Sequence, residues 1–501
     1  MNGETPRNPS VAVIGAGMTG ILMAIKLREA GIDDITILEK ADRVGGTWRE
    51  NTYPGVACDI PAHMYTYSFR GNPEWSHRLA HGEEIQAYFE QVAGQYGITG
   101  QVRFNESLDE CHYRDGRWHL TTSKGKALVV DFVVAATGIL HHPAYPDIPG
   151  LESFRGATWH TARWNHDLDL RGKRVGIIGT GSTAAQVISE IAGTAGHLTV
   201  FQRTPQWISP LPDKTYTERE KAALRGNQKR MDTLRERYAF VLRNTFSKAV
   251  TGSKLNHAWI SWLVKRNLRK SVRDPGLRAK LTPDYPVGCK RLIFSNTFYD
   301  AIQRDNVHLE THGIDHIDER GVATADGNRH DLDVLVLATG FSPFNFMRPM
   351  NLTGRDGLSI DEAWSRKVQA YRSVCLPGFP NFFLMLGPNT PIGNYSVIAM
   401  SEVQSRYVLK LIDHWRQGRL ETVEATEEAK VRFNTYLRAG MASTVWVGGC
   451  QSWYLDEDGD PALWPYSWTQ WEREMAEPEL DDFHPRAPAE VVPSRPEKEA
   501  A

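Results

Sequence analysis

Residues 11–20 read Val-Ala-Val-Ile-Gly-Ala-Gly-Met-Thr-Gly, an apolar run followed at once by glycines in the spacing G-x-G-x-x-G. Such a run is typical of a buried parallel strand, and helical spacing follows over residues 21–30. The glycines permit a tight turn and let the backbone approach a pyrophosphate, which the N-terminus of the next helix attracts. A second apolar run ends in Glu39, where an acid can accept a hydrogen bond from a ribose hydroxyl. Together these features predict a dinucleotide-binding unit.

A second unit of the same kind begins at the apolar run of residues 174–178. It turns at residues 179–184, Gly-Thr-Gly-Ser-Thr-Ala, where alanine in the last position still permits close helix packing. A strand is predicted over residues 198–201, and Arg203 then stands where an NAD site would carry an acid. Because an arginine can pair with a 2′-phosphate that an acid would repel, this unit favours NADPH over NADH. The alternative interpretation is a surface arginine after a strand.

Two glycine-containing pieces follow the first unit, Gly45-Gly46-Thr47-Trp48 and Tyr53-Pro54-Gly55. A Gly-Gly pair after the acidic strand is where flavoproteins let a loop reach back to the cofactor, so the first unit suits FAD better than NAD. A disulfide reductase would carry a redox-active cysteine pair in this region, and only Cys58 is present. Taken singly, each piece is also consistent with a turn-rich connection that carries core aromatics.

The length of 501 residues predicts two domains. The chain has 58 Lys and Arg and 60 Asp and Glu, which gives a net charge of −2. The overall electrostatic field therefore does not indicate nucleic acid or an anionic membrane as a partner. Five cysteines without metal-ligand spacing predict reduced thiols and no metal site. No signal peptide and no apolar run of ~18 residues is found. We expect a cytoplasmic protein without an integral membrane segment, and the oligomeric state is left open.

Two apolar pieces, residues 131–138 and 333–340, both end in Ala-Thr-Gly, and each fits the closing strand of a nucleotide-binding unit. We therefore predict an α/β protein with two Rossmann-like dinucleotide-binding domains, for FAD and NADPH, and a helical insertion. The insertion is basic and partly aromatic, which favours a solvated helical block over a membrane or partner contact. The predicted division is residues 1–145 for the first part of the FAD-binding domain, 146–332 for the NADPH-binding domain with the insertion at about 213–282, 333–485 for the completed FAD-binding domain with active-site loops, and 486–501 for a disordered tail.

The connection between the two units, residues 154–165, resembles the fingerprint of type I Baeyer–Villiger monooxygenases, F-x-G-x-x-x-H-x-x-x-W followed by Pro or Asp. The last position departs from the pattern, because it is Asn165, a polar residue close to Asp in size. The segment 46–59, the run 202–205 and the Ala-Thr-Gly-Phe ending at Phe341 are also similar to the family. The residues that match the fingerprint are Phe154, Gly156, His160 and Trp164, and the family role implied for His160 is structural or in domain coupling.

The resemblance implies FAD and NADPH as cofactors, with NADP⁺ retained during turnover, and O₂ as co-substrate. Arg291 matches the family's catalytic arginine, Asp59 its carboxylate partner, and Trp453 an aromatic residue that closes over the nicotinamide end. The implied FAD contacts are Gly15, Gly17, Gly20, Glu39, Gly46, Thr47, Trp48 and Asp59, and the implied NADPH contacts are Gly179, Gly181, Ser182, Thr183, Arg203, Thr204 and Lys290.

The activity implied by the resemblance is insertion of one oxygen atom next to the carbonyl of a lipophilic ketone, through a C4a-peroxyflavin, to give an ester or lactone. A nearby alternative is a class B flavin monooxygenase that oxidises nitrogen or sulfur. A more distant alternative is an NADPH oxidase-like or redox-sensing flavoprotein. The combination of Asp59 with Arg291 favours the ketone reaction.

Overall fold

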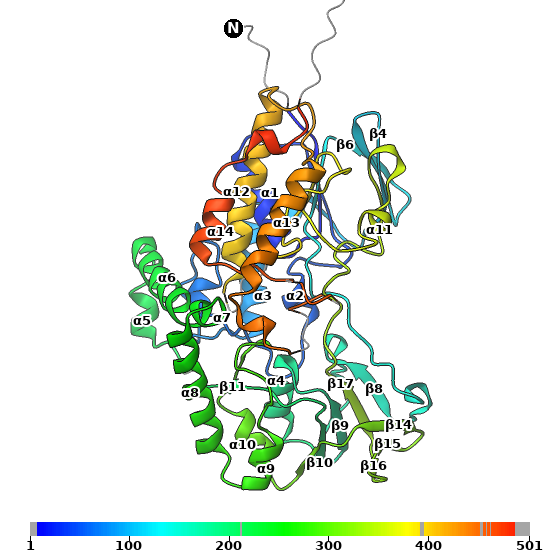
Figure 1. Cartoon of the computed structure of the whole chain (residues 1–501), viewed down its shortest axis with the longest axis vertical. Helices are drawn as coiled ribbons and strands as arrows, with labels where there is room; N and C mark the ends of the chain where they lie inside the picture. Colours follow the sequence, from blue (N-terminus) through cyan, green and yellow to red (C-terminus); the bar gives the residue numbers. More distant parts are fainter. Residues whose placement is uncertain are drawn as a thin grey trace, which may run out of the picture.

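The computed structural model describes residues 8–210, 213–390, 395–450, 454–456, 458–460 and 462–485. Two five-stranded parallel sheets form the frame of the molecule, one in the upper half of Figure 1 and one in the lower half. The strands in the middle of the sheets, such as those at residues 11–14, 132–135 and 334–337, are short and apolar, as expected of parallel strands covered by helices on both faces. The predicted α/β fold with two nucleotide-binding units is confirmed.

The first sheet has the strand order β19-β7-β1-β2-β3, and all of its pairs are parallel. Its central strand β1 is buried at every residue, which explains the unbroken apolar run that precedes the first glycine turn. The bounds are β1 Val11–Ile14, β2 Ile35–Leu38, β3 Val102–Arg103, β7 Phe132–Ala135 and β19 Phe382–Leu384.

Helices from both ends of the chain cover the first sheet (Figure 1). The long helix α12 (Val397–Arg416) packs beside α1 (Met18–Glu29), so the C-terminal part of the chain completes the unit that the N-terminal part begins. The other helices of this half are α2 Thr47–Glu50, α3 Gly82–Gln95, α11 Ile360–Ala363, α13 Glu427–Met441 and α14 Trp468–Glu474.

The second sheet has the order β13-β10-β9-β17-β8, again with parallel pairs. The strand β17 pairs with β9 and β8 and is therefore the closing strand of the second unit. The predicted domain boundary at residue 332 falls one strand too early, because the chain returns to the first unit only after β17. The bounds are β8 Ala157–His160, β9 Arg174–Ile178, β10 His197–Phe201, β13 Val307–Glu310, β17 Val334–Leu337, α4 Ser182–Ile191 and α10 Phe298–Ile302.

The described residues form three smaller sheets in addition to the two large ones. A four-stranded sheet follows α3, a three-stranded antiparallel sheet leads from β13 to β17, and β11 pairs with β12. Their bounds are β4 Leu108–Arg114, β5 Arg117–Thr122, β6 Ala127–Val130 and β18 Asn351–Thr353; β14 Ile314–Asp318, β15 Gly321–Thr324 and β16 Arg329–Asp331; β11 Ile208–Ser209 and β12 Ile293–Phe294.

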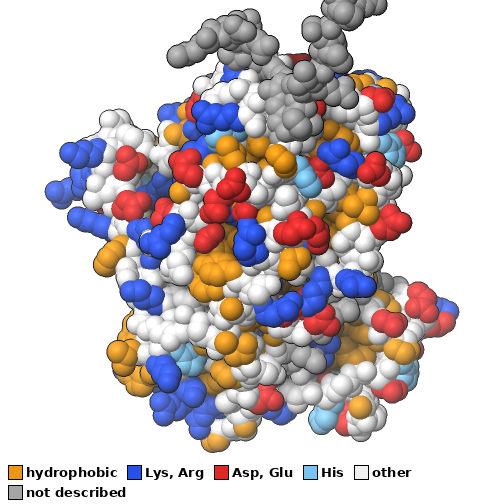
Figure 2. Space-filling model, turned by 45° about the horizontal axis from the view of Figure 1, so that its top comes forward, with side chains coloured by type: hydrophobic (Ala, Val, Ile, Leu, Met, Phe, Trp, Pro, Cys, Tyr) orange, Lys and Arg blue, Asp and Glu red, His pale blue; other side chains and the backbone are white. Residues whose placement is uncertain are grey.

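The basic insertion is helical and packs against both units, because α6 contributes Ala239 and Leu242 to the core of the first unit and α8 packs against the second. Ile260, Val264 and Leu268 of α8 are buried in the core of that unit, whereas Trp259 and Trp262 are exposed. Lys and Arg side chains gather along the left edge of Figure 2, where these helices project in Figure 1. In the part of the chain that the structure describes, no helix combines the length and apolar character needed to cross a membrane. The bounds are α5 Glu218–Ala222, α6 Gln228–Leu242, α7 Lys248–Val250, α8 Lys254–Ser271 and α9 Pro275–Lys280.

Candidate active site

A cavity of about 1600 Å³ lies between the two nucleotide-binding units. Both glycine turns line it, as does the predicted pair of Arg291 and Asp59. Pockets for one small molecule typically measure about 300–1,000 Å³, so this cavity has room for more than one ligand. One continuous site therefore joins the two units.

The first glycine of each turn packs against the end of its unit's closing strand. Gly15 has φ +101°, and a Cβ there would lie 2.7 Å from the carbonyl oxygen of Ala136. Gly179 has φ +117°, and its Cβ would lie 2.4 Å from the carbonyl oxygen of Ala338. The recurrence of Ala-Thr-Gly in the sequence thus reflects one steric arrangement that is built twice.

The helices that follow the two turns begin with open N-termini. In α1 and α4 the capping residues are Gly17 and Gly181, without a side-chain cap or an acid in the first turn among the described residues. By contrast, α12, α13 and α14 are capped by Ser396, Thr426 and Ser467. Uncapped backbone N–H groups at a helix N-terminus bind anions such as phosphate. Both turns are therefore suited to a pyrophosphate.

Two substitutions in the second turn separate folding from binding. Gly179→Ala should lower the free energy of unfolding by at least about 1–2 kcal/mol, because of its positive φ and the nearby carbonyl. A Cβ on Gly181 would have no atom within 4 Å, and its φ is normal for any residue. The free energy of unfolding of Gly181→Ala should therefore stay within about 0.5 kcal/mol of that of the unaltered protein. The Gly181→Ala variant should instead raise the KM for the dinucleotide, because a pyrophosphate bound at the turn would lie against this backbone. Denaturant unfolding and kinetics of the matched pair test this, and equal unfolding curves would contradict it.

Residues after β2 form the wall of the first unit's side of the cavity. The buried Glu39 carboxylate accepts hydrogen bonds from the backbone N–H groups of Ala16 (2.7 Å) and Ala41 (2.9 Å), which fixes the glycine turn to β2. A Cβ on Gly46 would lie 2.9 Å from the Cα of Gly17, so the Gly-Gly loop does reach back to the first turn. Trp48 lines the cavity beside it.

Arg291 and Asp59 form an ion pair that crosses from one unit to the other. The guanidinium Nη2 lies 2.7 Å from Asp59 Oδ2, and 37% of the arginine side chain remains exposed where it lines the cavity. Attraction to Asp59 raises the pKa of Arg291 above its ordinary value, so the cation is permanent. The Tyr454 phenol lies close to Arg291, and burial raises the pKa of this phenol to about 12. A fixed positive charge thus faces the cavity.

The backbone near Arg291 is held by the short β11–β12 pair. Ile293 donates a hydrogen bond to the carbonyl oxygen of Trp207 (3.3 Å), and Ser295 donates to that of Ser209 (3.1 Å). Because β11 follows Arg203 along the chain, this pairing connects the arginine of the predicted phosphate site to the predicted catalytic arginine.

A disulfide joins Cys289 to Cys450, two residues from Arg291 and four from Tyr454 in sequence. Their Cα atoms are 6.1 Å apart, within the normal range for a disulfide. The prediction that all five cysteines are reduced is therefore wrong for these two. The pairing spans 161 residues, and no local spacing signals it. Cys58, Cys111 and Cys375 are free and buried.

Arg203 and Lys290 place two positive charges on the second unit's side of the cavity. Burial, and then the nearby positive charge of Arg203, lower the pKa of Lys290. The described residues offer Arg203 no ion pair within 4.0 Å. Two neighbouring cations at the end of β10 form a suitable site for a phosphate group.

The fingerprint segment lies outside the cavity lining. His160 Nδ1 accepts a hydrogen bond from the Ala162 N–H, so Nε2 carries the proton and donates to the Gly340 carbonyl oxygen at 3.0 Å. Burial lowers the pKa of His160, which keeps the ring neutral. It therefore ties the end of β8 to the Ala-Thr-Gly end of β17. Asn165 Oδ1 accepts from the Asp167 N–H at 3.0 Å, a turn contact that an Asp could also make.

The other fingerprint residues have packing roles. A Cβ on Gly156 would lie 2.6 Å from the Asp333 carbonyl oxygen, Phe154 packs in the small core near Ile317, and Trp164 meets Trp159 edge to face. This segment thus shapes the second unit and does not contact the reacting groups.

Most of the predicted site residues come together around the cavity. Gly20 does not line it, because a Cβ there would lie 1.8 Å from the Gly15 carbonyl oxygen, and its role is to let α1 pack against the turn. Trp453 lies outside the described residues. The sequence did not assign roles to Tyr53 and Gln186, whose hydrogen bond (2.9 Å) connects the two units. The predicted residues that line the cavity are Gly15, Gly17, Glu39, Gly46, Thr47, Trp48, Asp59, Gly179, Gly181, Ser182, Thr183, Arg203, Thr204, Lys290 and Arg291.

Comparison with known proteins agrees with this geometry. Residues 8–418 match the family described as flavin-binding monooxygenase-like, and the chain belongs to this family. It is 46% identical to an uncharacterized monooxygenase of Mycobacterium tuberculosis, over 92% of this chain and 93% of the relative. It is 39% identical to a Baeyer-Villiger monooxygenase of Streptomyces coelicolor, over 96% and 93%. The structure of cyclohexanone monooxygenase from Rhodococcus sp. Phi1 bound to NADP⁺ is similar, with a TM-score of 0.83, 28% identity, and coverage of 94% and 97%.

Proposed function

We propose that this protein is an FAD-containing, NADPH- and O₂-dependent Baeyer–Villiger monooxygenase that converts a lipophilic ketone to an ester or lactone. The observation that carries the proposal is the Arg291–Asp59 pair, which lies in a single cavity with two dinucleotide-binding turns. The similarity to curated Baeyer-Villiger monooxygenases supports the ketone reaction over nitrogen or sulfur oxidation.

The residues present fit both cofactors. FAD would lie on the first turn, with Glu39 near its ribose and the Gly46–Trp48 loop against it, and NADPH would lie on the second turn. The fit rests on the two open helix N-termini and on the approach of Gly46 to Gly17, which leave backbone rather than side chains facing the cavity. When bound, FAD accepts hydride from NADPH and activates O₂.

Arg291 would stabilise the negative charge that develops on oxygen during insertion. A guanidinium suits this role because it stays charged and offers several donors. Asp59 orients the guanidinium by accepting its hydrogen bond at 2.7 Å. Since the charge is fixed before substrate arrives, it needs no reorganisation during the reaction.

The cavity wall near the ion pair would receive the ketone. Apolar side chains at Ile60, Tyr65 and Phe294 line this region, and further along the cavity are Leu386 and Tyr395. A wall of this kind provides apolar contacts and leaves Arg291 as the polar partner of a carbonyl oxygen. A lipophilic ketone is therefore the substrate class that matches the site.

A panel of ketones with the purified, FAD-loaded protein tests the proposal directly. Under ¹⁸O₂ we expect one labelled oxygen in an ester or lactone, with NADPH consumption matched to product. A thioether is assayed in parallel. Sulfoxide as the sole product would favour the nitrogen- or sulfur-oxidising alternative, and hydrogen peroxide matching NADPH with every compound would favour an oxidase.

Arg203→Ala should weaken the binding of NADPH much more than the binding of NADH. Charged hydrogen bonds to a 2′-phosphate contribute about 1.5–3 kcal/mol, so the preference for NADPH over NADH, measured as the ratio of kcat/KM, should fall about 10- to 100-fold. The exposed Arg155, which pairs with Glu319, is the control, and Arg155→Ala should leave this preference unchanged. A similar loss for both nucleotides in Arg203→Ala would refute the 2′-phosphate contact.

A further inference from the structure

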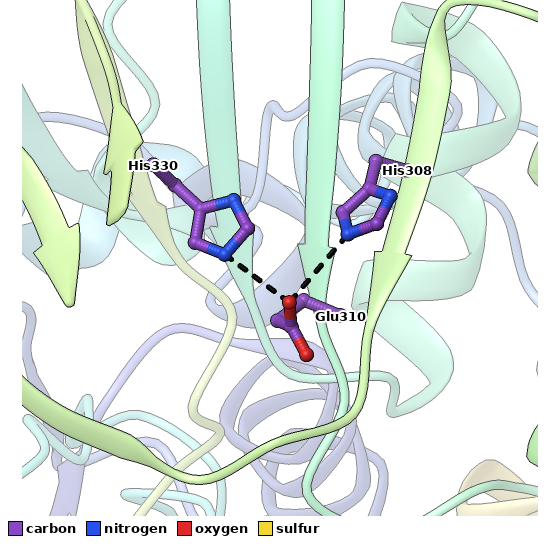
Figure 3. Close-up of side chains that lie close together, drawn as sticks. All are labelled: His308, Glu310 and His330. Atoms are coloured by element: carbon purple, nitrogen blue, oxygen red, sulfur yellow. Dashed lines mark ion pairs between the residues drawn. The ribbon is translucent and has the colours of Figure 1, made fainter. Parts of the chain in front are cut away.

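Three histidines gather around one buried glutamate at the edge of the second sheet, outside the groups used above. Glu310 ends β13, and only 5% of its side chain is exposed. His308 lies two residues earlier, on the same face of the strand, and His330 reaches over from β16. Figure 3 shows both rings directed at the Glu310 carboxylate. His312 follows on the loop that leads into the cavity wall.

The two distances from Glu310 Oε2 to the imidazole nitrogens match the spacing of ligand atoms around a tetrahedral metal ion. Glu310 Oε2 lies 3.5 Å from His308 Nε2 and 3.2 Å from His330 Nε2, and the three ligand atoms all lie within 4.8 Å of one another. A tetrahedral zinc ion with bonds of about 2.0–2.2 Å holds neighbouring ligand atoms about 3.3–3.6 Å apart. Small side-chain adjustments would bring all three atoms onto one ion.

His330 provides an independent observation. Its Nε2 is buried and makes no hydrogen bond to any described residue, although Glu310 Oε2 is only 3.2 Å away. A buried ring nitrogen without a hydrogen bond is poorly compensated for its lost hydration, and a bound ion or water would supply the missing interaction. The nitrogen faces the same carboxylate oxygen as His308, so one bound ion would satisfy both.

The other carboxylate oxygen of Glu310 is fixed by its surroundings. Oε1 accepts hydrogen bonds from the backbone N–H groups of Thr311 (2.7 Å) and His312 (2.8 Å) and contacts His312 Nδ1 at 2.8 Å. His312 Nδ1 also lies 3.1 Å from Asp326. Such outer contacts orient a metal-binding carboxylate, and they leave Oε2 directed at the two imidazoles.

We propose that His308, Glu310 and His330 bind a divalent transition metal ion, with Zn²⁺ the best match. Imidazole nitrogen and carboxylate oxygen are ordinary zinc ligands, and three protein ligands leave one position for water. The ion would tie the small antiparallel sheet to the edge strand of the second unit, next to residues 312–314 of the cavity wall. Its role is structural. The competing explanation is a set of direct contacts between the histidines and Glu310 without a metal ion.

Zinc binding can be measured on the full-length protein, purified without a histidine tag and stripped with a chelator. Added Zn²⁺ should raise the Tm, and Mg²⁺ should not, because Mg²⁺ prefers oxygen ligands in octahedral geometry. Co²⁺ as a spectroscopic probe should give the strong visible absorption of a tetrahedral site. No Tm change and no such absorption would overturn the proposal.

Variants assign the binding to these residues. His308→Gln changes a half-exposed side chain and should preserve the fold, and both it and His330→Gln should weaken Zn²⁺ binding at least about tenfold. The control is His316→Gln on β14, because His316 pairs with Asp315 outside the cluster. Equal Zn²⁺ affinity in His308→Gln and the unaltered protein would overturn the assignment.

Discussion

Replacing Arg291 by Ala is expected to slow ester formation about 10²–10³-fold while NADPH still reduces the bound flavin. The variant loses the cation that lies 2.7 Å from Asp59 and lines the cavity. Removing one charge-stabilising donor from a comparable site typically costs about 10²–10³-fold in kcat. Consumed NADPH should then appear as hydrogen peroxide. Stopped-flow reduction, product analysis and peroxide release measure the three parts of this expectation.

Two further variants sharpen the test of Arg291. Arg291→Lys keeps the charge but loses the planar fork of donors, one of which Asp59 holds, so it should recover only part of the activity. Arg163→Ala removes a half-exposed arginine near Glu50 that does not line the cavity, and it should behave like the unaltered protein. Full ester formation by Arg291→Ala would exclude the proposed role.

Removal of the Cys289–Cys450 disulfide should have the largest effect on stability. It closes a loop of 161 residues between the second unit and the C-terminal part of the first. In the chain-entropy model a loop of this length contributes about 5 kcal/mol, and measured values are commonly about 2–4 kcal/mol. For the paired variant Cys289→Ser with Cys450→Ser we expect the Tm to fall by about 3–8 °C.

Reducing agent and thiol counting serve as controls for the disulfide. A reductant should lower the Tm of the unaltered protein and leave that of the paired variant unchanged. The unfolded, unreduced protein should show three free thiols, those of Cys58, Cys111 and Cys375. Cys375→Ser is a further control, because Cys375 is buried but forms no disulfide. Its effect on the Tm measures the cost of burying a serine hydroxyl in place of a thiol, without the loss of a crosslink. Five titratable thiols would contradict the pairing.

The strands next to the glycine turns were predictable because local chemistry determines their ends. The run before Gly15 is apolar at every residue since both faces of β1 are buried, and the glycine ends it. The boundary after residue 332 was placed wrongly for a related reason. The two Ala-Thr-Gly pieces look alike, and only the pairing of β17 with β9 shows to which sheet the second one belongs.

The candidate site was predictable to a different degree at each position. The turns follow from spacing, whereas Asp59 and Arg291 lie 232 residues apart, and only family resemblance brought them together. The disulfide has no local signal. The histidine cluster does have a local sequence signal, because His308, Glu310 and His312 alternate along a strand and its end. The third proposed ligand, His330, comes from another sheet and has no such signal.

The contact between each glycine turn and its strand-end alanine also bears on protein engineering. Because the carbonyl oxygens of Ala136 and Ala338 occupy the space that a Cβ on Gly15 or Gly179 would need, the end of the partner strand is part of what shapes each turn. A turn transplanted alone into another scaffold would lack the surface that shapes it. The smallest exchangeable cassette is therefore discontinuous, consisting of strand, turn and helix together with the distant Ala-Thr-Gly strand.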